Sequence, residues 1–171
     1  MPEEERTLRL NLGCGTKQFE GFVNVDKVQL PGVDAIADLE EKRWPWDDNS
    51  IEEIRAYHII EHIREPYDFV QECRRILKPG GILDLRFPHR KHHTAYVITH
   101  RNRFDEYSFV SVTATHQFDI AELNVLHDWP YYWHIQNHLG EWLLKMPFFR
   151  KREVQIKLRK AVRKEQGDIQ E

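Results

Sequence analysis

The chain has only two cysteines, Cys14 and Cys73, among 171 residues. Two are too few for the disulfide framework of a small secreted protein. No run approaches the roughly 18 consecutive apolar residues that a membrane-spanning helix needs. The acidic segment from Met1 to Arg6 also lacks the basic and then apolar layout of a secretion signal. We therefore expect a soluble, cytoplasmic protein with no membrane partner.

Net charge is low, at -3, but the charges are unevenly placed along the chain. Residues 86–104 carry five basic and no acidic residues, and residues 145–164 carry nine basic residues and one acidic residue. Such blocks form either solvated surface or binding sites for phosphate, nucleic acid or charged metabolites. The length and the 40% apolar content fit one globular domain, which we place at residues 1–165, with a frayed tail at 166–171.

Short apolar runs predict strands at residues 7–12, 21–26, 33–38, 51–57 and 82–87. A helix is predicted from Glu65 and Pro66 onward, because apolar residues recur there at helical spacing until residues 78–81 stop it. Farther on we expect a loop with a short helix at 88–104, a strand at 118–125, a short helix at 137–146 and a strand at 152–158. Residues 16–20 and 27–32 are too short for an ordinary crossover helix. The fold class is therefore an α/β, doubly wound and mostly parallel sheet with reduced helices between its first three strands.

A glycine turn, Gly13-Cys14-Gly15, directly follows the first predicted strand. Glycine lets a backbone approach a ligand in several nucleotide-binding folds, so this turn alone is weak evidence. Asp26 ends the second strand, where a carboxylate can accept hydrogen bonds from both hydroxyls of a ribose. Asp38 ends the third strand, in reach of an adenine amino group. Together they predict an adenosine site at the carboxyl edge of a parallel sheet.

Five segments in order resemble the class I S-adenosylmethionine-dependent methyltransferases, in particular small members of the type-11 kind without N-terminal cap helices. They are Leu10-Asn-Leu-Gly-Cys-Gly15, Asn24-Val-Asp26, Asp38-Leu39, His58-Ile-Ile-Glu-His62 and Arg75-Ile-Leu-Lys-Pro-Gly-Gly81. The resemblance implies a seven-stranded sheet whose last strand is antiparallel, with S-adenosyl-L-methionine as cofactor and S-adenosyl-L-homocysteine as product.

The same resemblance implies roles for individual residues. The turn Gly13-Cys14-Gly15 would line the methionine part of the cofactor, and Asp26 would hold its ribose. Asp38 and Leu39 would flank the adenine, and His58 would lie beneath the sulfonium.

Two histidines are candidates for the catalytic base. His62 is predicted at the start of the helix after the fourth strand, where related methyltransferases often place a base, and an imidazole has a suitable pKa. Capping or packing of the next turn is the competing interpretation for His62. His100, beside Arg101, follows the fifth strand. For binding the acceptor we single out Arg90, Arg101 and Tyr132. The competing interpretations are that the two arginines lie in a solvated loop and that Tyr132 is part of the core.

Histidine is also a metal ligand, and His89, His92 and His93 or the pair His134 and His138 could serve. Arg90 and Lys91 lie within the first group and would oppose a dication, so we expect no metal.

The leading hypothesis is methyl transfer to a hydroxyl, amine or carboxyl group of a small or medium, anionic acceptor. Nucleic-acid methylation is the runner-up, with backbone contacts from residues 150–164, although no Asp/Asn-Pro-Pro-Tyr/Phe clamp follows the fourth strand. A non-catalytic cofactor-binding module also stays open. A dehydrogenase is disfavoured because Gln18 stands where its fingerprint needs a third glycine. Uncovered sheet faces would favour a homodimer.

Overall fold

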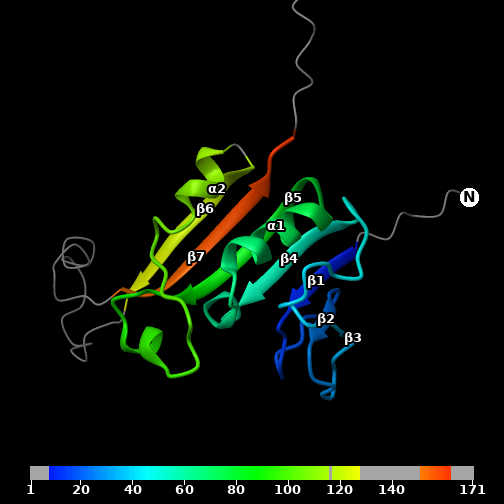
Figure 1. Cartoon of the computed structure of the whole chain (residues 1–171), viewed down its shortest axis with the longest axis horizontal. Helices are drawn as coiled ribbons and strands as arrows, with labels where there is room; N and C mark the ends of the chain where they lie inside the picture. The colour runs from blue at the N-terminus through cyan, green and yellow to red at the C-terminus, as the bar shows by residue number, and fades with distance from the viewer. Residues whose placement is uncertain (1–7, 116, 128–150, 163–171) are drawn as a thin grey trace, which may run out of the picture.

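The computed structural model describes residues 8–115, 117–127 and 151–162, which form one seven-stranded sheet (Figure 1). The strands are β1 (Leu8–Leu12), β2 (Val23–Asp26), β3 (Ala35–Ile36), β4 (Ile51–Tyr57), β5 (Leu77–Pro88), β6 (Phe118–His127) and β7 (Lys151–Lys160). Their order is β3-β2-β1-β4-β5-β7-β6. All pairings are parallel except those of β7, which runs antiparallel to β5 and β6. The predicted α/β sheet with its antiparallel last strand is confirmed.

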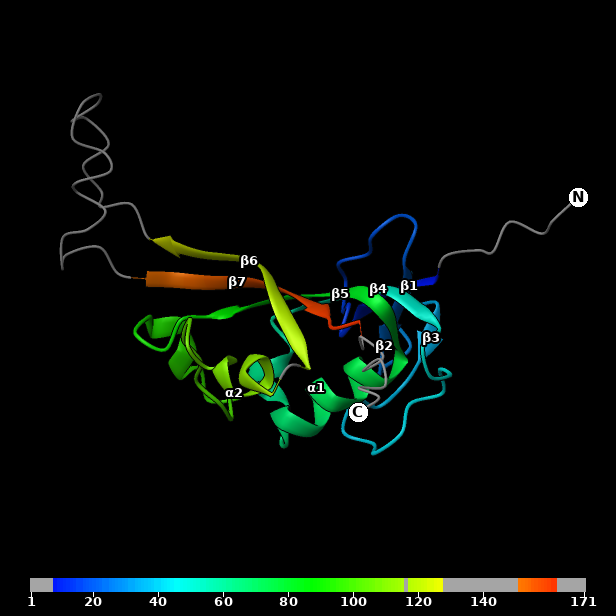
Figure 2. The ribbon, with the colours of Figure 1, turned by 90° about the horizontal axis from the view of Figure 1, so that it is seen from above.

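One face of the sheet carries the hydrophobic core, and both α-helices lie on that side (Figure 2). The helix α1 (Pro66–Ile76) begins at a proline, as predicted, and buries Phe69, Val70, Cys73 and Ile76. The second helix is α2 (Val110–Ala114), and two short 3-10 helices, η1 (Ile60–His62) and η2 (His93–Tyr96), follow β4 and β5. None of the helices described is long and apolar enough to cross a bilayer.

No helix connects β1 to β2 or β2 to β3, and residues 13–34 are all described. The loop after β1 instead returns along the opposite face of the sheet from α1. There the Phe19 ring meets the edge of Tyr57 at a centroid distance of 5.7 Å, and the Arg55 guanidinium lies 4.2 Å from the centre of the Phe22 ring. A loop with two aromatic anchors thus stands where a crossover helix would pack.

The sheet face opposite α1, here called the polar face, carries charged residues in rows across the strands. Strand register sets Arg55 of β4 beside Asp84 of β5, then Lys157 of β7, then Glu122 of β6, so that the signs alternate. Lys157 donates to Glu122 at 2.6 Å, and Tyr57 donates to Asp84 at 2.7 Å. Because its charged groups pair with one another across the strands, this face needs no apolar layer to cover it.

The largest differences from the predicted boundaries are in two strands. β3 has two residues in place of six, and β5 begins at Leu77, directly after α1, in place of residue 82. Gly80 has φ +80°, and a Cβ on Gly81 would lie 2.9 Å from the carbonyl oxygen of Glu52, so these glycines let the segment run close to β4. The predicted helix at 137–146 and the tail at 166–171 lie outside the described residues.

Candidate active site at the carboxyl ends of the parallel strands

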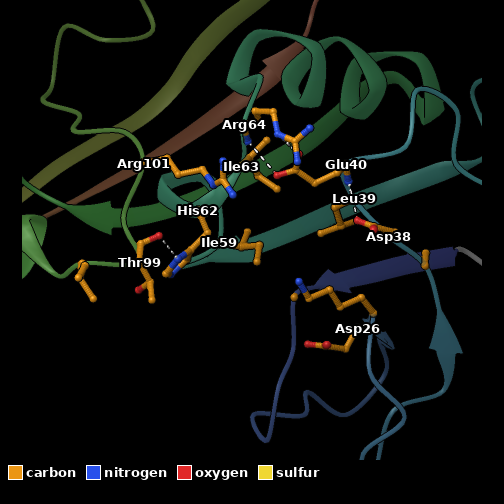
Figure 3. A pocket seen from close by; sticks show the side chains of 14 residues that line it. Asp26, Asp38, Leu39, Glu40, Ile59, His62, Ile63, Arg64, Thr99 and Arg101 are labelled. Carbon is orange, nitrogen blue, oxygen red and sulfur yellow. Dashed lines mark hydrogen bonds and ion pairs between the residues drawn. The ribbon is translucent and has the colours of Figure 1, made fainter.

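A cavity of about 780 Å³ opens at the carboxyl edge of β1, β2 and β4. Figure 3 shows Asp26 and Asp38 on one side of it and His62 and Thr99 on the other. The lining comprises Gly13, Asp26, Lys27, Ala37, Asp38, Leu39, Glu40, Ile59, His62, Ile63, Arg64, Ile98, Thr99 and Arg101. Gly13 of the glycine turn, Asp26 and Asp38 thus share one cavity, although Asp38 lies two residues past β3 and does not end it.

Both glycines of the turn have the left-handed backbone conformation that glycine adopts easily. Gly13 has φ +64°, and a Cβ there would come within 2.7 Å of the Ile59 side chain. Gly15 has φ +51° and open space within 4 Å of where its Cβ would stand. Both positions therefore favour glycine, the first because of its neighbour as well as its backbone.

Asp26 is oriented by the backbone around it. Its Oδ2 accepts a hydrogen bond of 2.9 Å from the Gly15 N–H, and its Oδ1 accepts one of 3.1 Å from the Val28 N–H. The carboxylate is held at the cavity with lone pairs still available for hydroxyl donors. Asp38 accepts from the Glu40 N–H at 2.9 Å and exposes its side chain at the rim, while Leu39 is buried beside it.

A second cavity, of about 490 Å³, lies on the other side of Gly13. Its lining includes Cys14, Gly15, Tyr57, His58 and Glu153. Burial, followed by the charge of Asp26, raises the pKa of the Cys14 thiol, so Cys14 is a packing residue of this wall and a poor nucleophile. The two cavities meet at the glycine turn, as the two halves of an elongated ligand would require.

His58 directly follows β4 and has a left-handed conformation, with φ +57°. Its Nε2 lies 3.1 Å from the carboxylate of Glu153 and its Nδ1 lies 3.5 Å from that of Glu61. The contacts with the carboxylates of Glu153 and then Glu61 raise the pKa of His58 to about 9. The ring is therefore positively charged at neutral pH, and two carboxylates more than balance that charge. No local pattern pointed to Glu153, because it comes from a distant strand.

His62 lines the larger cavity, whereas His100 lines neither cavity and packs against the His62 ring. Their ring centroids are 4.6 Å apart and the rings are nearly perpendicular. The Nδ1 of His62 lies 3.1 Å from the carbonyl oxygen of Thr99, and burial lowers the pKa of His100. The expectation that His62 begins the long helix is wrong: it ends η1, and α1 starts only at Pro66, because a separate turn intervenes.

The three residues assigned to the acceptor have different outcomes. Arg101 lines the first cavity. Arg90 lines neither cavity and pairs with Asp105 at 2.8 Å. Tyr132 lies outside the described residues, as do His134 and His138.

Residues 14–85 match the family model of a methyltransferase domain. A probable S-adenosylmethionine-dependent methyltransferase of Mycolicibacterium smegmatis is 37% identical over 46 residues, which is 27% of this chain and only 18% of that relative. A methyltransferase structure from Archaeoglobus fulgidus matches with a TM-score of 0.71 and 16% identity, over 90% of this chain and 86% of that one. The [4+2]-cyclase SpnF matches with a TM-score of 0.64 and 18% identity, over 92% and 76% of the two chains.

The match over residues 14–85, the short stretch shared with the mycobacterial relative and the shared fold support a class I S-adenosylmethionine-dependent methyltransferase. S-adenosylmethionine is the cofactor of this family, and the residues present fit it. The Asp26 carboxylate faces the larger cavity, and the space over Gly15 would be narrowed by any side chain. The family resemblance in the sequence is thereby confirmed.

Proposed function

We propose that the protein transfers a methyl group from S-adenosylmethionine to a hydroxyl, amine or carboxyl group of a small or medium, anionic acceptor. The observation that carries the proposal is the placement of His62 across the first cavity from Asp26, with the His100 ring packed against His62. A carboxylate suited to a ribose and an imidazole thus face one space.

The two cavities supply complementary halves of a cofactor site. Asp26 would hold the ribose, and Asp38 with Leu39 would flank the adenine in the larger cavity. The methionine part would follow the turn from Gly13 to Gly15 toward His58 in the smaller one. The excess of carboxylate around the His58 imidazolium, from Glu61 and Glu153, suits a cationic sulfonium nearby.

The cofactor supplies the methyl group already activated on a sulfonium. The protein therefore has to orient an in-line transfer and help the acceptor to lose its proton. When Nδ1 of His62 donates to the Thr99 carbonyl, its Nε2 keeps a free lone pair. His100 is neutral at physiological pH because burial lowers its pKa. Both rings are thus suited to take part in removing the acceptor proton.

The rim of the larger cavity supports an acceptor that is both anionic and partly apolar. Arg101 provides an exposed positive charge there, and Ile98 is 99% exposed at the same rim. An exposed isoleucine beside an arginine fits a carboxylate or phosphate attached to an apolar body.

Nucleic acid, the alternative acceptor, has less support from the structure of β7. The alternating residues Val154, Ile156 and Leu158 of β7 are buried, so the basic residues between them belong to the outer face of an ordinary strand. Lys157 is paired with Glu122, and Lys160 donates to the carbonyl of Leu77 at 2.6 Å. DNA or RNA affinity that falls steeply with salt would favour this alternative.

Two further expectations stay proposals. A homodimer would appear as twice the chain mass in light scattering. A non-catalytic module would bind cofactor without transferring a methyl group to any acceptor pool; the SpnF likeness shows that this fold occurs in a protein described as a cyclase.

The test is a thermal melt with S-adenosylhomocysteine, with NAD and ATP as controls. Ligand at 100 times its Kd stabilises a protein by about 2.7 kcal/mol. We expect a selective upward shift that Asp26→Ala abolishes. The matched control is Asp34→Ala, because Asp34 binds the Asn24 backbone away from both cavities. This control should keep the shift at a lower melting temperature.

Transfer is then followed with methyl-labelled cofactor and a low-molecular-mass metabolite extract. Labelled product that His62→Ala and His100→Ala both reduce would support the proposal. A folded wild-type protein whose melt responds to neither cofactor nor product would overturn it.

A further inference from the structure

We propose that Glu61, His62 and His100 bind a divalent transition-metal ion beside the cofactor cavity. The proposal rests on the proposed function and deepens it, since the ion would lower the pKa of the acceptor group at the position where His62 and His100 lie. It departs from the expectation that no metal is held, which considered only other histidines.

The three side chains converge although they come from two separate segments. One nitrogen of each ring and one carboxylate oxygen lie within 4.8 Å of one another. Bonds of about 2.0–2.2 Å to one tetrahedral ion would bring such atoms to about 3.4 Å apart. Side-chain rotations could close that difference of about an ångström. Glu61 and His62 belong to η1, and His100 belongs to the loop after β5.

Glu61 is the residue that most needs a ligand. Its side chain is only 2% exposed, and neither carboxylate oxygen accepts a hydrogen bond from the part of the chain that the structure describes. Its charged neighbour His58 is 3.5 Å away, whereas His58 holds Glu153 more closely, at 3.1 Å. The Nδ1 of His100 is likewise buried without a hydrogen bond. Buried polar atoms left in this state are costly unless something occupies the space between them.

The backbone around the three residues is fixed, as a metal site requires. The carbonyl of Glu61 accepts hydrogen bonds from the N–H groups of Arg101 and Asn102, at 2.8 and 3.1 Å. The Asn102 side chain also donates to the carbonyl of Ile63 at 2.6 Å. These bonds hold η1 against the loop that carries His100. The Thr99 carbonyl takes Nδ1–H of His62 and directs Nε2 outward, which is the usual outer-shell arrangement of a metal-binding histidine.

The ligand set selects the class of metal. Two imidazoles and one carboxylate suit Zn²⁺, Mn²⁺, Fe²⁺, Co²⁺ or Ni²⁺, whereas Ca²⁺ and Mg²⁺ prefer all-oxygen sites. Three protein ligands leave a position open for an acceptor oxygen, as in catalytic sites. The site borders the first cavity, because His62 and Thr99 line that cavity.

The ion would act as a Lewis acid on the acceptor. An acceptor hydroxyl bound to it would lose its proton to water at the cavity mouth at lower pH than in solution. One C–O bond then forms while one C–S bond of the cofactor breaks, and the electron pair of that bond stays on sulfur. No oxidant or reductant is needed.

The experiment uses the untagged full chain, stripped with a chelator and titrated with Zn²⁺, or with Co²⁺ as a coloured probe of coordination. We expect one equivalent to bind. Glu61→Gln and His100→Ala should each weaken binding by more than about 100-fold, since even outer partners of metal ligands contribute about 10–100-fold. His93→Ala is the matched control, because His93 is exposed and lies outside the cluster.

Each outcome decides the proposal. Binding that persists in His93→Ala and is lost in the two cluster variants supports it. Absence of binding, or equal binding in all variants, overturns it and returns His62 and His100 to direct proton transfer. The S-adenosylhomocysteine melt on the same samples is read separately: a missing shift counts against the proposed function, whatever the metal result. Should Glu61→Gln fail to fold, the His100→Ala titration decides.

Discussion

Glu153 of β7 reaches across β5 to His58, the residue after β4, with 3.1 Å between Oε2 and Nε2. The contact joins two strands that are not neighbours in the sheet. Because His58 also meets Glu61, the imidazolium ties β7 and η1 to one point at the smaller cavity.

The stability of the protein should therefore depend on pH through His58. Its pKa is about 9 in the folded protein against an ordinary value of 6.5. The stabilising contribution is fully present below about pH 6.5 and is lost as the pH rises through about 9. The melting temperature, measured from pH 6 to 10, should fall more steeply in wild type than in His58→Asn. Asparagine is chosen because it tolerates the left-handed backbone. An unchanged slope in His58→Asn, with His93→Asn as control, would contradict this assignment.

Gly13→Ala should destabilise the fold and prevent cofactor binding. A left-handed backbone costs an L-residue about 1–2 kcal/mol, and crowding against Ile59 adds a further cost of about 1–3 kcal/mol. Gly80→Ala is the control, since Gly80 has φ +80° but open space around its Cβ position. Urea unfolding should show a greater loss for Gly13→Ala than for Gly80→Ala. Equal losses would mean that Ile59 simply moves aside.

Tyr57→Phe should cost about 1–3 kcal/mol of stability, because Asp84 would lose the hydroxyl donor at 2.7 Å while remaining buried. Burial already raises the pKa of Asp84, so its carboxylate depends on the partners it has. Tyr67→Phe, at an exposed position of α1, should change little. Chemical denaturation of both variants measures the difference, and a neutral Tyr57→Phe would show that water replaces the hydroxyl.

Lys157→Glu should destabilise the sheet by about 1–2 kcal/mol at low salt, because it would set three acids side by side in the row from Asp84 to Glu122. Lys157→Ala should cost less than about 1 kcal/mol, as expected for an exposed pair. Added salt should reduce the effect of Lys157→Glu. A salt-independent loss would point to packing instead of charge.

Much of the fold could be predicted because its signals are local. The apolar runs of β1, β2, β4 and β7 appear in the sequence at strand spacing, and α1 shows its buried stripe after Pro66. Boundaries were less predictable: β5 starts five residues early, at Leu77 in place of residue 82, because Gly80 and Gly81 allow a close approach to β4 that no periodicity shows.

The sequence by itself determined the glycine turn, the acid at the end of β2 and, through the family resemblance, the seven-stranded sheet with its antiparallel last strand. These features depend on short stretches of sequence. Gly13 and Asp26, for example, are separated only by one loop and β2. Only the tertiary structure decided that Glu153 meets His58, that Glu61, His62 and His100 converge, and that charges alternate across the polar face. Strand register and loop docking create those contacts, and both are set by packing between segments far apart in the chain.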